Sequence, residues 1–284
     1  MVAAQPRSRV AATAMALVVA TGTLQIATAT PAQASLSGLQ IVSAVSLANS
    51  TSPKSIIASC PTGKRVIGTG FIIDGDATQV VLDDLIPTST SVMATGYEDG
   101  DATTGDWWIR AFAVCADPLP GLEIVALTSA SSSASKLATA TCSSGKRILG
   151  SGAAITGGTG QVVLDEMAPG DTTASATAYE DVDGTSANWT VTSYAICALA
   201  PAGLQVVLST TFPDYSSSQT ATPGCPSGTS PLSVGWQINT RYSGTIFPII
   251  AMPSQTDAYV TAGINNTPGL SAWSVTGRVV CATP

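Results

Sequence analysis

Clusters of acidic side chains are the part of this sequence best suited to chemistry. One type of cluster is a loop that occurs twice, with carboxylates at neighbouring and alternate positions. The first loop contains Glu98, Asp99 and Asp101, and the second contains Glu180, Asp181 and Asp183. Calcium takes about six to eight oxygen ligands, often from alternating carboxylates in turns. We therefore predict a calcium site in each loop, the alternative being a solvated hairpin loop that uses Asp and Gly for its turn.

Adjacent carboxyl groups form the second type of cluster. Asp83-Asp84 and Asp165-Glu166 each follow the tetrapeptide QVVL. Two carboxyls flanking a sugar could serve as the acid and the nucleophile of a glycosidase. Neighbouring residues of a regular strand point to opposite faces, so we expect that neither pair shares one substrate. A pairing of Glu166 with Glu180 across strands stays open, and glycoside hydrolysis is the most distant of the functions considered.

The composition excludes several other classes of chemistry. The chain has 284 residues, with 18 acidic and 11 basic side chains and no His. Ser-His-Asp or Cys-His catalysis and His metal ligands are therefore excluded. A net charge of −7 also excludes the basic surface that nucleic-acid binding needs. We predict that the protein is not an enzyme and requires no cofactor, calcium being the exception named above.

Two basic pairs and one aromatic residue are further binding candidates. Lys64-Arg65 and Lys146-Arg147 could hold an acidic glycan or another chain, or could simply be exposed starts of strands. Trp108 follows another Trp and should point away from the core if its neighbour points inward. We count these five residues as candidate contacts with a partner.

The N-terminus is typical of a secretory signal peptide. Arg7 and Arg9 precede an uncharged stretch over 10–29, and Ala32-Gln33-Ala34 matches a small-residue cleavage site. We predict a signal peptide over 1–34. A membrane anchor is the alternative, but the stretch is diluted by Thr and Gly, so no membrane span is expected. Secretion would remove two basic residues and leave a more acidic extracellular protein.

The rest of the chain repeats itself three times. The sequence GLQIV at 38–42 returns as GLEIV at 121–125 and as GLQVV at 203–207. We therefore divide the chain into repeat 1 (38–120), repeat 2 (121–202) and repeat 3 (203–284). Repeat 3 lacks the basic pair and most of the acids. Its apolar stretch 246–253 stands where the other repeats have paired carboxyls, and it predicts either packing against a neighbouring repeat or self-association.

Six cysteines in an exported chain predict disulfides. The repeat favours the within-repeat pairs Cys60–Cys115, Cys142–Cys197 and Cys225–Cys281. The alternative joins Cys115 to Cys142 and Cys197 to Cys225, which leaves the two outer cysteines at opposite ends of the chain. A metal-thiolate site would need CxxC spacing or a nearby His, and the sequence has neither.

Short runs of alternating apolar and polar residues predict an all-β fold. In repeat 1 we expect strands near 38–46, 54–60, 64–74, 78–86, 91–98 and 107–116. The glycines within 64–70 should mark a bulge or a close backbone contact between sheets. The repeats should be disulfide-stapled and sandwich-like, arranged either as successive sandwiches or about a pseudo-threefold axis. Trp107, Trp189 and Trp273 should lie in their cores.

Two resemblances rest on these motifs. CPTGKRVIGTG at 60–70 and CSSGKRILGSG at 142–152, with WWIRAFAVCADP and NWTVTSYAICA further on, resemble secreted repeat proteins of actinobacterial type. The Cys-Pro-x-Gly opening and the triplication are similar to vitelline membrane outer layer protein I, a three-fold β-prism of extracellular coats. Both resemblances imply an extracellular, non-catalytic, disulfide-bonded β protein.

The leading function is therefore that of a secreted binding or structural protein of the cell envelope or extracellular matrix. Its expected partner is an extracellular polymer or a cell-surface protein, because repetition multiplies weak sites. A calcium-dependent carbohydrate-binding module is the first alternative to this function.

Overall fold

Alternating and β-branched segments of the sequence form strands throughout the computed structural model. The structure describes residues 1, 3, 36–100, 102–241, 243–265 and 271–284. The predicted signal peptide and Asp101 therefore lie outside the described residues, apart from positions 1 and 3. Within the described part, the helical content is a single 3₁₀ turn at Ala77–Gln79, and no helix is long and apolar enough to cross a membrane.

Each repeat contributes six strands. Repeat 1 forms β1 (Gln40–Val45), β2 (Lys54–Ser59), β3 (Arg65–Gly75), β4 (Val80–Pro87), β5 (Ser91–Glu98) and β6 (Trp107–Ala116). Repeat 2 forms β7 (Glu123–Thr128), β8 (Lys136–Thr141), β9 (Arg147–Thr156), β10 (Val162–Pro169), β11 (Thr173–Glu180) and β12 (Thr190–Ala198). Repeat 3 forms β13 (Gln205–Thr210), β14 (Ser218–Ala221), β15 (Ser230–Asn239), β16 (Ile246–Pro253), β17 (Ala258–Ile264) and β18 (Ser274–Ala282). The all-β prediction and the strand positions expected for repeat 1 are confirmed.

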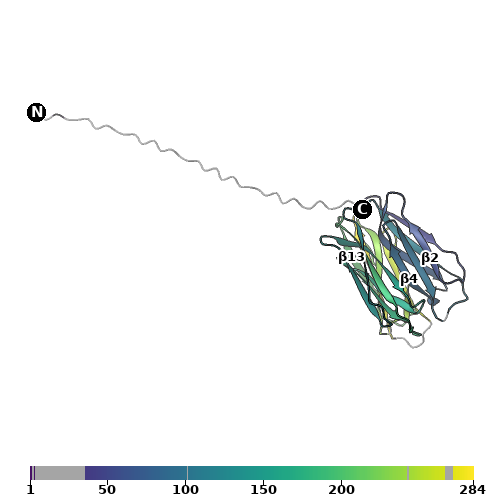
Figure 1. Cartoon of the computed structure of the whole chain (residues 1–284). Coiled ribbons are helices and arrows are strands. Elements are labelled where there is room, and N and C mark those ends of the chain that lie inside the picture. Colours follow the sequence, from purple (N-terminus) through teal and green to yellow (C-terminus); the bar gives the residue numbers. More distant parts are fainter. Residues whose placement is uncertain (2, 4–35, 101, 242, 266–270) are drawn as a thin grey trace. The chain divides into compact units, whose positions relative to one another are not determined.

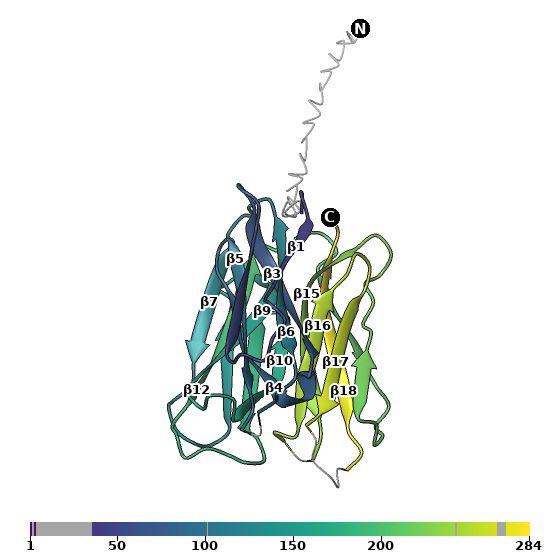
Figure 2. The ribbon, with the colours of Figure 1, turned by 90° about the vertical axis from the view of Figure 1, so that its right-hand side faces the viewer.

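The strands assemble into three six-stranded sheets, and each sheet combines two repeats. Sheet I has the order β1-β6-β3-β16-β17-β14, sheet II the order β2-β5-β4-β9-β12-β7, and sheet III the order β13-β18-β15-β10-β11-β8. Figure 2 shows this mixing in sheet I, where blue strands of repeat 1 lie beside yellow-green strands of repeat 3. Every repeat is thus sandwich-like, with one three-stranded layer in each of two sheets.

The disulfides join the two layers of each repeat. Cys60, Cys142 and Cys225 follow or lie near the second strand, and their partners lie in the sixth strand. The within-repeat pairing Cys60–Cys115, Cys142–Cys197 and Cys225–Cys281 is confirmed, and no described cysteine is free. Three disulfides indicate an oxidising environment such as the extracellular space.

Removal of one disulfide should cost a substantial part of the stability. The Cys60–Cys115 bond closes a loop with a sequence separation of 55. In the chain-entropy model a bond of this span stabilises by about 4 kcal/mol, and measured losses are typically about 2–5 kcal/mol. We expect the double variant Cys60→Ala, Cys115→Ala to lose that amount of unfolding free energy in urea titrations. An unchanged midpoint would contradict the expectation.

The strands of all three repeats lie together in one compact body (Figure 1), and the repeats meet at a common axis inside it. Val81, Val163 and Phe247 hold corresponding places in the three repeats and pack together, each at most 1% exposed. Thr69 links all three repeats, because its hydroxyl donates to the carbonyl of Ser151 (2.6 Å) and its N–H donates to Ser233 Oγ (3.3 Å). Of the two arrangements expected, the pseudo-threefold one is observed.

Glycine is needed where the strands approach this axis. A Cβ on Gly68 would overlap the carbonyl oxygen of Leu232, and a Cβ on Gly150 would lie 2.8 Å from the carbonyl oxygen of Ile67. The register of β3 and β6 also shifts between Val66 and Gly68. The predicted bulge and the predicted close backbone contact therefore both occur in this motif.

Candidate functional site

Two pockets lie where strands of neighbouring repeats join within one sheet. In sheet II, β4 of repeat 1 pairs with β9 of repeat 2 only at Asp84–Ala154 and Leu85–Ala153. In sheet III, β10 of repeat 2 pairs with β15 of repeat 3 at Glu166–Gln237 and Met167–Trp236. Cavities of about 360 Å³ and 550 Å³ lie beside these short junctions. We call them the first and second carboxyl pockets, because each is lined by an adjacent acidic pair.

A β-bulge brings each acidic pair into one pocket. The register of β4 against β5 shifts between Leu82 and Asp84, and that of β10 against β11 shifts between Leu164 and Glu166. Asp83 and Asp165 are the extra residues. Since a bulge interrupts the alternation of side chains, Asp83 lines the same pocket as Asp84, and Asp165 lines the same pocket as Glu166. The expectation that the two acids of each pair lie on opposite faces was therefore wrong, because both line one pocket.

In the first carboxyl pocket the acids lie among tyrosines. Asp83 is only 8% exposed, and burial together with the negative charge of Asp84 raises its pKa to about 8. Burial also raises the pKa of Asp84, against the effect of a hydrogen bond from Thr95. Tyr97 and Tyr194 complete the pocket, and the pKa of each is raised by burial and by nearby carboxylates. At neutral pH Asp83 thus carries its proton and offers both a donor and an acceptor.

In the second carboxyl pocket the ionisable groups have more polar neighbours. Glu166 accepts hydrogen bonds from Ser175 Oγ (3.1 Å) and Thr177 Oγ1 (3.3 Å). Asp165 is 8% exposed, and its Oδ1 is buried with no hydrogen-bond partner among the described residues. Burial and the charge of Glu166 raise the pKa of Asp165 to about 7. The other lining groups include Tyr179, Gln237, Asn239 and Arg241.

The third junction, between β16 and β3 in sheet I, is apolar. Ile249 and Ile250 stand where the other repeats have acids, and Gly263 stands where they have tyrosine. A Cβ on Gly263 would lie 2.6 Å from Cδ1 of Ile249, so the isoleucine occupies the space of the missing aromatic ring. Within the same stretch Ile246 and Phe247 are buried, which agrees with packing against neighbouring repeats. Self-association through repeat 3 stays a prediction.

In the loops predicted to bind calcium, carboxylates accept hydrogen bonds from other groups of the chain. Glu98 accepts a hydrogen bond from the indole N–H of Trp107 (2.8 Å), and Glu180 accepts one from Trp189 (3.1 Å). Asp181 accepts from the N–H of Gly184 (2.9 Å). Across the residues that the structure describes, no group of three or more His, Cys, Asp or Glu side chains is placed to hold a metal.

Among the described residues, the other carboxylates of these loops, Asp99 and Asp183, do not form a metal site either. Asp99 accepts from the side-chain amide of Asn265 (2.6 Å), which ties repeat 1 to repeat 3, while Asp183 is exposed and Asp101 lies outside the described residues. Calcium binding therefore stays a prediction.

The buried indoles of Trp107, Trp189 and Trp273 confirm the predicted core tryptophans.

Most of the basic residues predicted to contact a partner form ion pairs within the chain. Lys64 pairs with Asp117 (2.7 Å), Lys146 with Glu123, and Arg147 with Asp171. Arg65 takes part in none of the ion pairs found among the described residues. Trp108 lies in sheet I with the guanidinium of Arg110 5.4 Å from its ring centroid, and so it is separate from both carboxyl pockets.

Sequence reasoning missed the tyrosines and amides of the two pockets. Tyr97 and Tyr179 hold corresponding places in repeats 1 and 2, which was the available signal. Tyr194 and Gln237 reach the pockets only because strands of different repeats join there, and no local pattern indicates that pairing.

The comparisons with known proteins assign neither a family nor a function to the chain. No protein-family model matches the chain, and none of the curated proteins is significantly similar to it.

Proposed function

We propose that the protein is a secreted, non-catalytic binding protein of a cell envelope or extracellular matrix, and that its two carboxyl pockets bind hydroxyl groups of a carbohydrate polymer. The observation that carries this proposal is the duplicated pocket in which a bulge presents two carboxyls beside tyrosine. The predicted signal peptide and the three disulfides support the extracellular location.

The chemistry of the pockets suits a neutral polyhydroxyl ligand. A protonated Asp83 supplies a donor at neutral pH, and the oxygens of the two neighbouring carboxyls supply acceptors; sugar hydroxyls need both. Tyrosine adds an apolar ring and a polar hydroxyl in the same side chain. Asp165 Oδ1 is an acceptor with no described partner, and a ligand hydroxyl would satisfy it.

The arrangement of the pockets favours a polymer over a single sugar. Both pockets belong to the one compact body, so two segments of a chain can be held at a fixed separation. Two linked weak sites gain avidity without new contacts when the ligand spans both. Binding through repeated weak contacts is therefore expected, with the strength depending on the length of the polymer.

Neutralising one carboxylate in each pocket should abolish this binding. We expect Asp84→Asn or Glu166→Gln to weaken binding to an array of neutral oligosaccharides by roughly tenfold, since a charged hydrogen bond contributes about 1.5–3 kcal/mol. The double variant should lose binding to the long polymers altogether. Titration calorimetry with the best oligosaccharide of the array measures both effects.

The matched control is Asp74→Asn, which removes an exposed carboxylate outside both pockets. It should bind as the unchanged protein does, and undiminished binding by the double variant would contradict the proposal. Loss of binding in a calcium chelator would instead favour the calcium-dependent module. Release of reducing ends from the bound polymer would favour a hydrolase, since each bulge brings two carboxyls together.

A further inference from the structure

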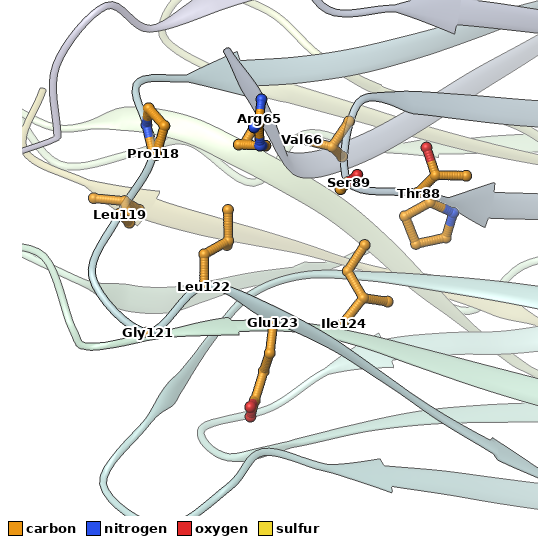
Figure 3. A pocket seen from close by; sticks show the side chains of 11 residues that line it. Arg65, Val66, Thr88, Ser89, Pro118, Leu119, Gly121, Leu122, Glu123 and Ile124 are labelled. Atoms are coloured by element: carbon orange, nitrogen blue, oxygen red, sulfur yellow. The ribbon is translucent and has the colours of Figure 1, made fainter. Parts of the chain in front are cut away.

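A cavity of a different kind lies where repeat 1 continues into repeat 2. Its volume is about 600 Å³, which is within the usual size of small-molecule pockets. The apolar lining residues, which we call the apolar groove, are Val66, Pro87, Pro118, Leu119, Leu122 and Ile124. Figure 3 shows that Leu122 and Ile124 point toward the side of Arg65, while Glu123 between them points away. Glu123 is the ion-pair partner of Lys146, so among the charged residues that line the cavity Arg65 is the one without a described ion-pair partner.

In repeat 2, the arginine that corresponds to Arg65 has an acidic ion-pair partner. The corresponding arginine, Arg147, pairs with the carboxylate of Asp171. In repeat 1 the residue in the place of Asp171 is Ser89. The backbone is equivalent in the two repeats, because Val66 N–H donates to the carbonyl of Ser89 as Ile148 N–H does to that of Asp171, both at 3.1 Å.

Arg65 is therefore a half-buried cation that the chain does not neutralise. Its guanidinium donates to the carbonyl of Lys64 (3.0 Å), and no ion pair among the described residues includes it. A guanidinium presents several N–H donors in a planar fork that suits a carboxylate.

We propose that the apolar groove binds a small amphiphile with a carboxylate head, such as a medium-chain fatty acid. The carboxylate pairs with Arg65 in place of the side chain that Asp171 supplies in repeat 2, and the hydrocarbon chain packs on Leu122 and Ile124. This site is separate from the carboxyl pockets and does not depend on carbohydrate binding.

The molecule contains a matched groove without the cation. The corresponding cavity between repeats 3 and 1, also about 600 Å³, is lined by Leu39, Ile41 and Val42. Ser230 stands there in the place of Arg65, and Gln255 in the place of Ser89. Apolar contact is thus available in both grooves, while pairing with an anion is available only in the first.

The test uses decanoate and the uncharged decan-1-ol as probes in titration calorimetry at one pH. Decanoate should bind with one site, and Arg65→Gln should weaken that binding about tenfold or more, as expected for loss of a charged hydrogen bond. Ser89→Asp should weaken it similarly, since the new carboxylate pairs with Arg65 within the chain. Ser89 is exposed, so this variant should fold normally. Gln255→Asp adds the same charge beside the other groove and should leave the affinity unchanged.

Methyl NMR then locates the site, with decanoate shifting the resonances of Leu122 and Ile124. Several results would overturn the proposal: no decanoate binding at about 1 mM, decan-1-ol binding as tightly as decanoate, or an unchanged affinity in Ser89→Asp. Methyl shifts confined to other parts of the molecule would overturn it as well.

Discussion

Replacement of Gly68 by Ala is expected to lower the unfolding free energy by about 3 kcal/mol or more, because it disturbs the packing of all three repeats. The added Cβ would overlap the carbonyl oxygen of Leu232, a backbone atom that cannot turn aside as a side chain can. Relief of the overlap would move β3 away from β15 and break the contacts of Thr69 with the other two repeats. Overpacking of a well-packed core costs about 1–3 kcal/mol, and a backbone clash at the axis should reach at least the upper end of that range. Urea unfolding followed by near-ultraviolet circular dichroism measures the loss.

Gly170→Ala is the control for this prediction. Gly170 is not among the described glycines with positive φ, and the nearest atom to an added Cβ would be the carbonyl oxygen of Thr173, at 3.1 Å. The loss of unfolding free energy in Gly170→Ala should stay below about 1 kcal/mol, because Ala also lowers the entropy of the unfolded chain. If Gly68→Ala were as stable as this control, the close approach of the three repeats would be contradicted.

The second large effect is a loss of stability as the pH rises from about 4 to about 8. In the folded protein the pKa of Asp83 is raised to about 8 and that of Asp165 to about 7, whereas an unfolded aspartate titrates near pH 4. Between these values the folded state holds protons that the unfolded chain has released. Stability from these two groups is therefore complete below about pH 4 and declines until the folded groups ionise. Each of these two aspartates lowers the unfolding free energy by at most about 1.4 kcal/mol per pH unit over this range.

Urea titrations at pH 5, 7 and 9 should show this decline, with pH 5 giving the highest unfolding free energy. Asp83→Asn and Asp165→Asn should flatten the profile and raise stability at pH 9, while the exposed Asp74→Asn should not. Carboxyls with lowered pKa values, such as Asp117 and Glu123, lose their stabilising effect only as the pH falls below about 4. A stability that rises between pH 5 and pH 9 would contradict the raised pKa values.

Strand positions and disulfides were predictable because both depend on local or repeated patterns. Alternation of apolar residues placed β6 at 107–116, and the equal spacing of cysteines selected Cys60–Cys115 over its alternative. The distribution of strands over sheets was not predictable. The local pattern indicates that β4 is a strand, but it does not indicate that the neighbour of β4 is β9 of another repeat.

The candidate site was predictable only as a set of acids. The pairs at 83–84 and 165–166 were recognised, but their orientation was misjudged because a bulge leaves no mark in the apolar pattern. The neighbours of the acids depend on the pairing of strands between repeats. Tyr194 reaches Asp84 through that pairing, so the tyrosine-lined pocket could be seen only in the assembled structure.

The sharing of every sheet between two repeats makes this single chain equivalent to a cyclic trimer. Each repeat offers one half-sheet to the repeat before it and another to the repeat after it, and the series closes after three. This is the head-to-tail contact by which identical subunits form rings. Loss of any one repeat would expose two further sheet edges in addition to the outer edges of the sheets, and such edges tend to aggregate. The peptide joints between repeats therefore connect, in sequence order, units whose cyclic arrangement is already defined by strand pairing.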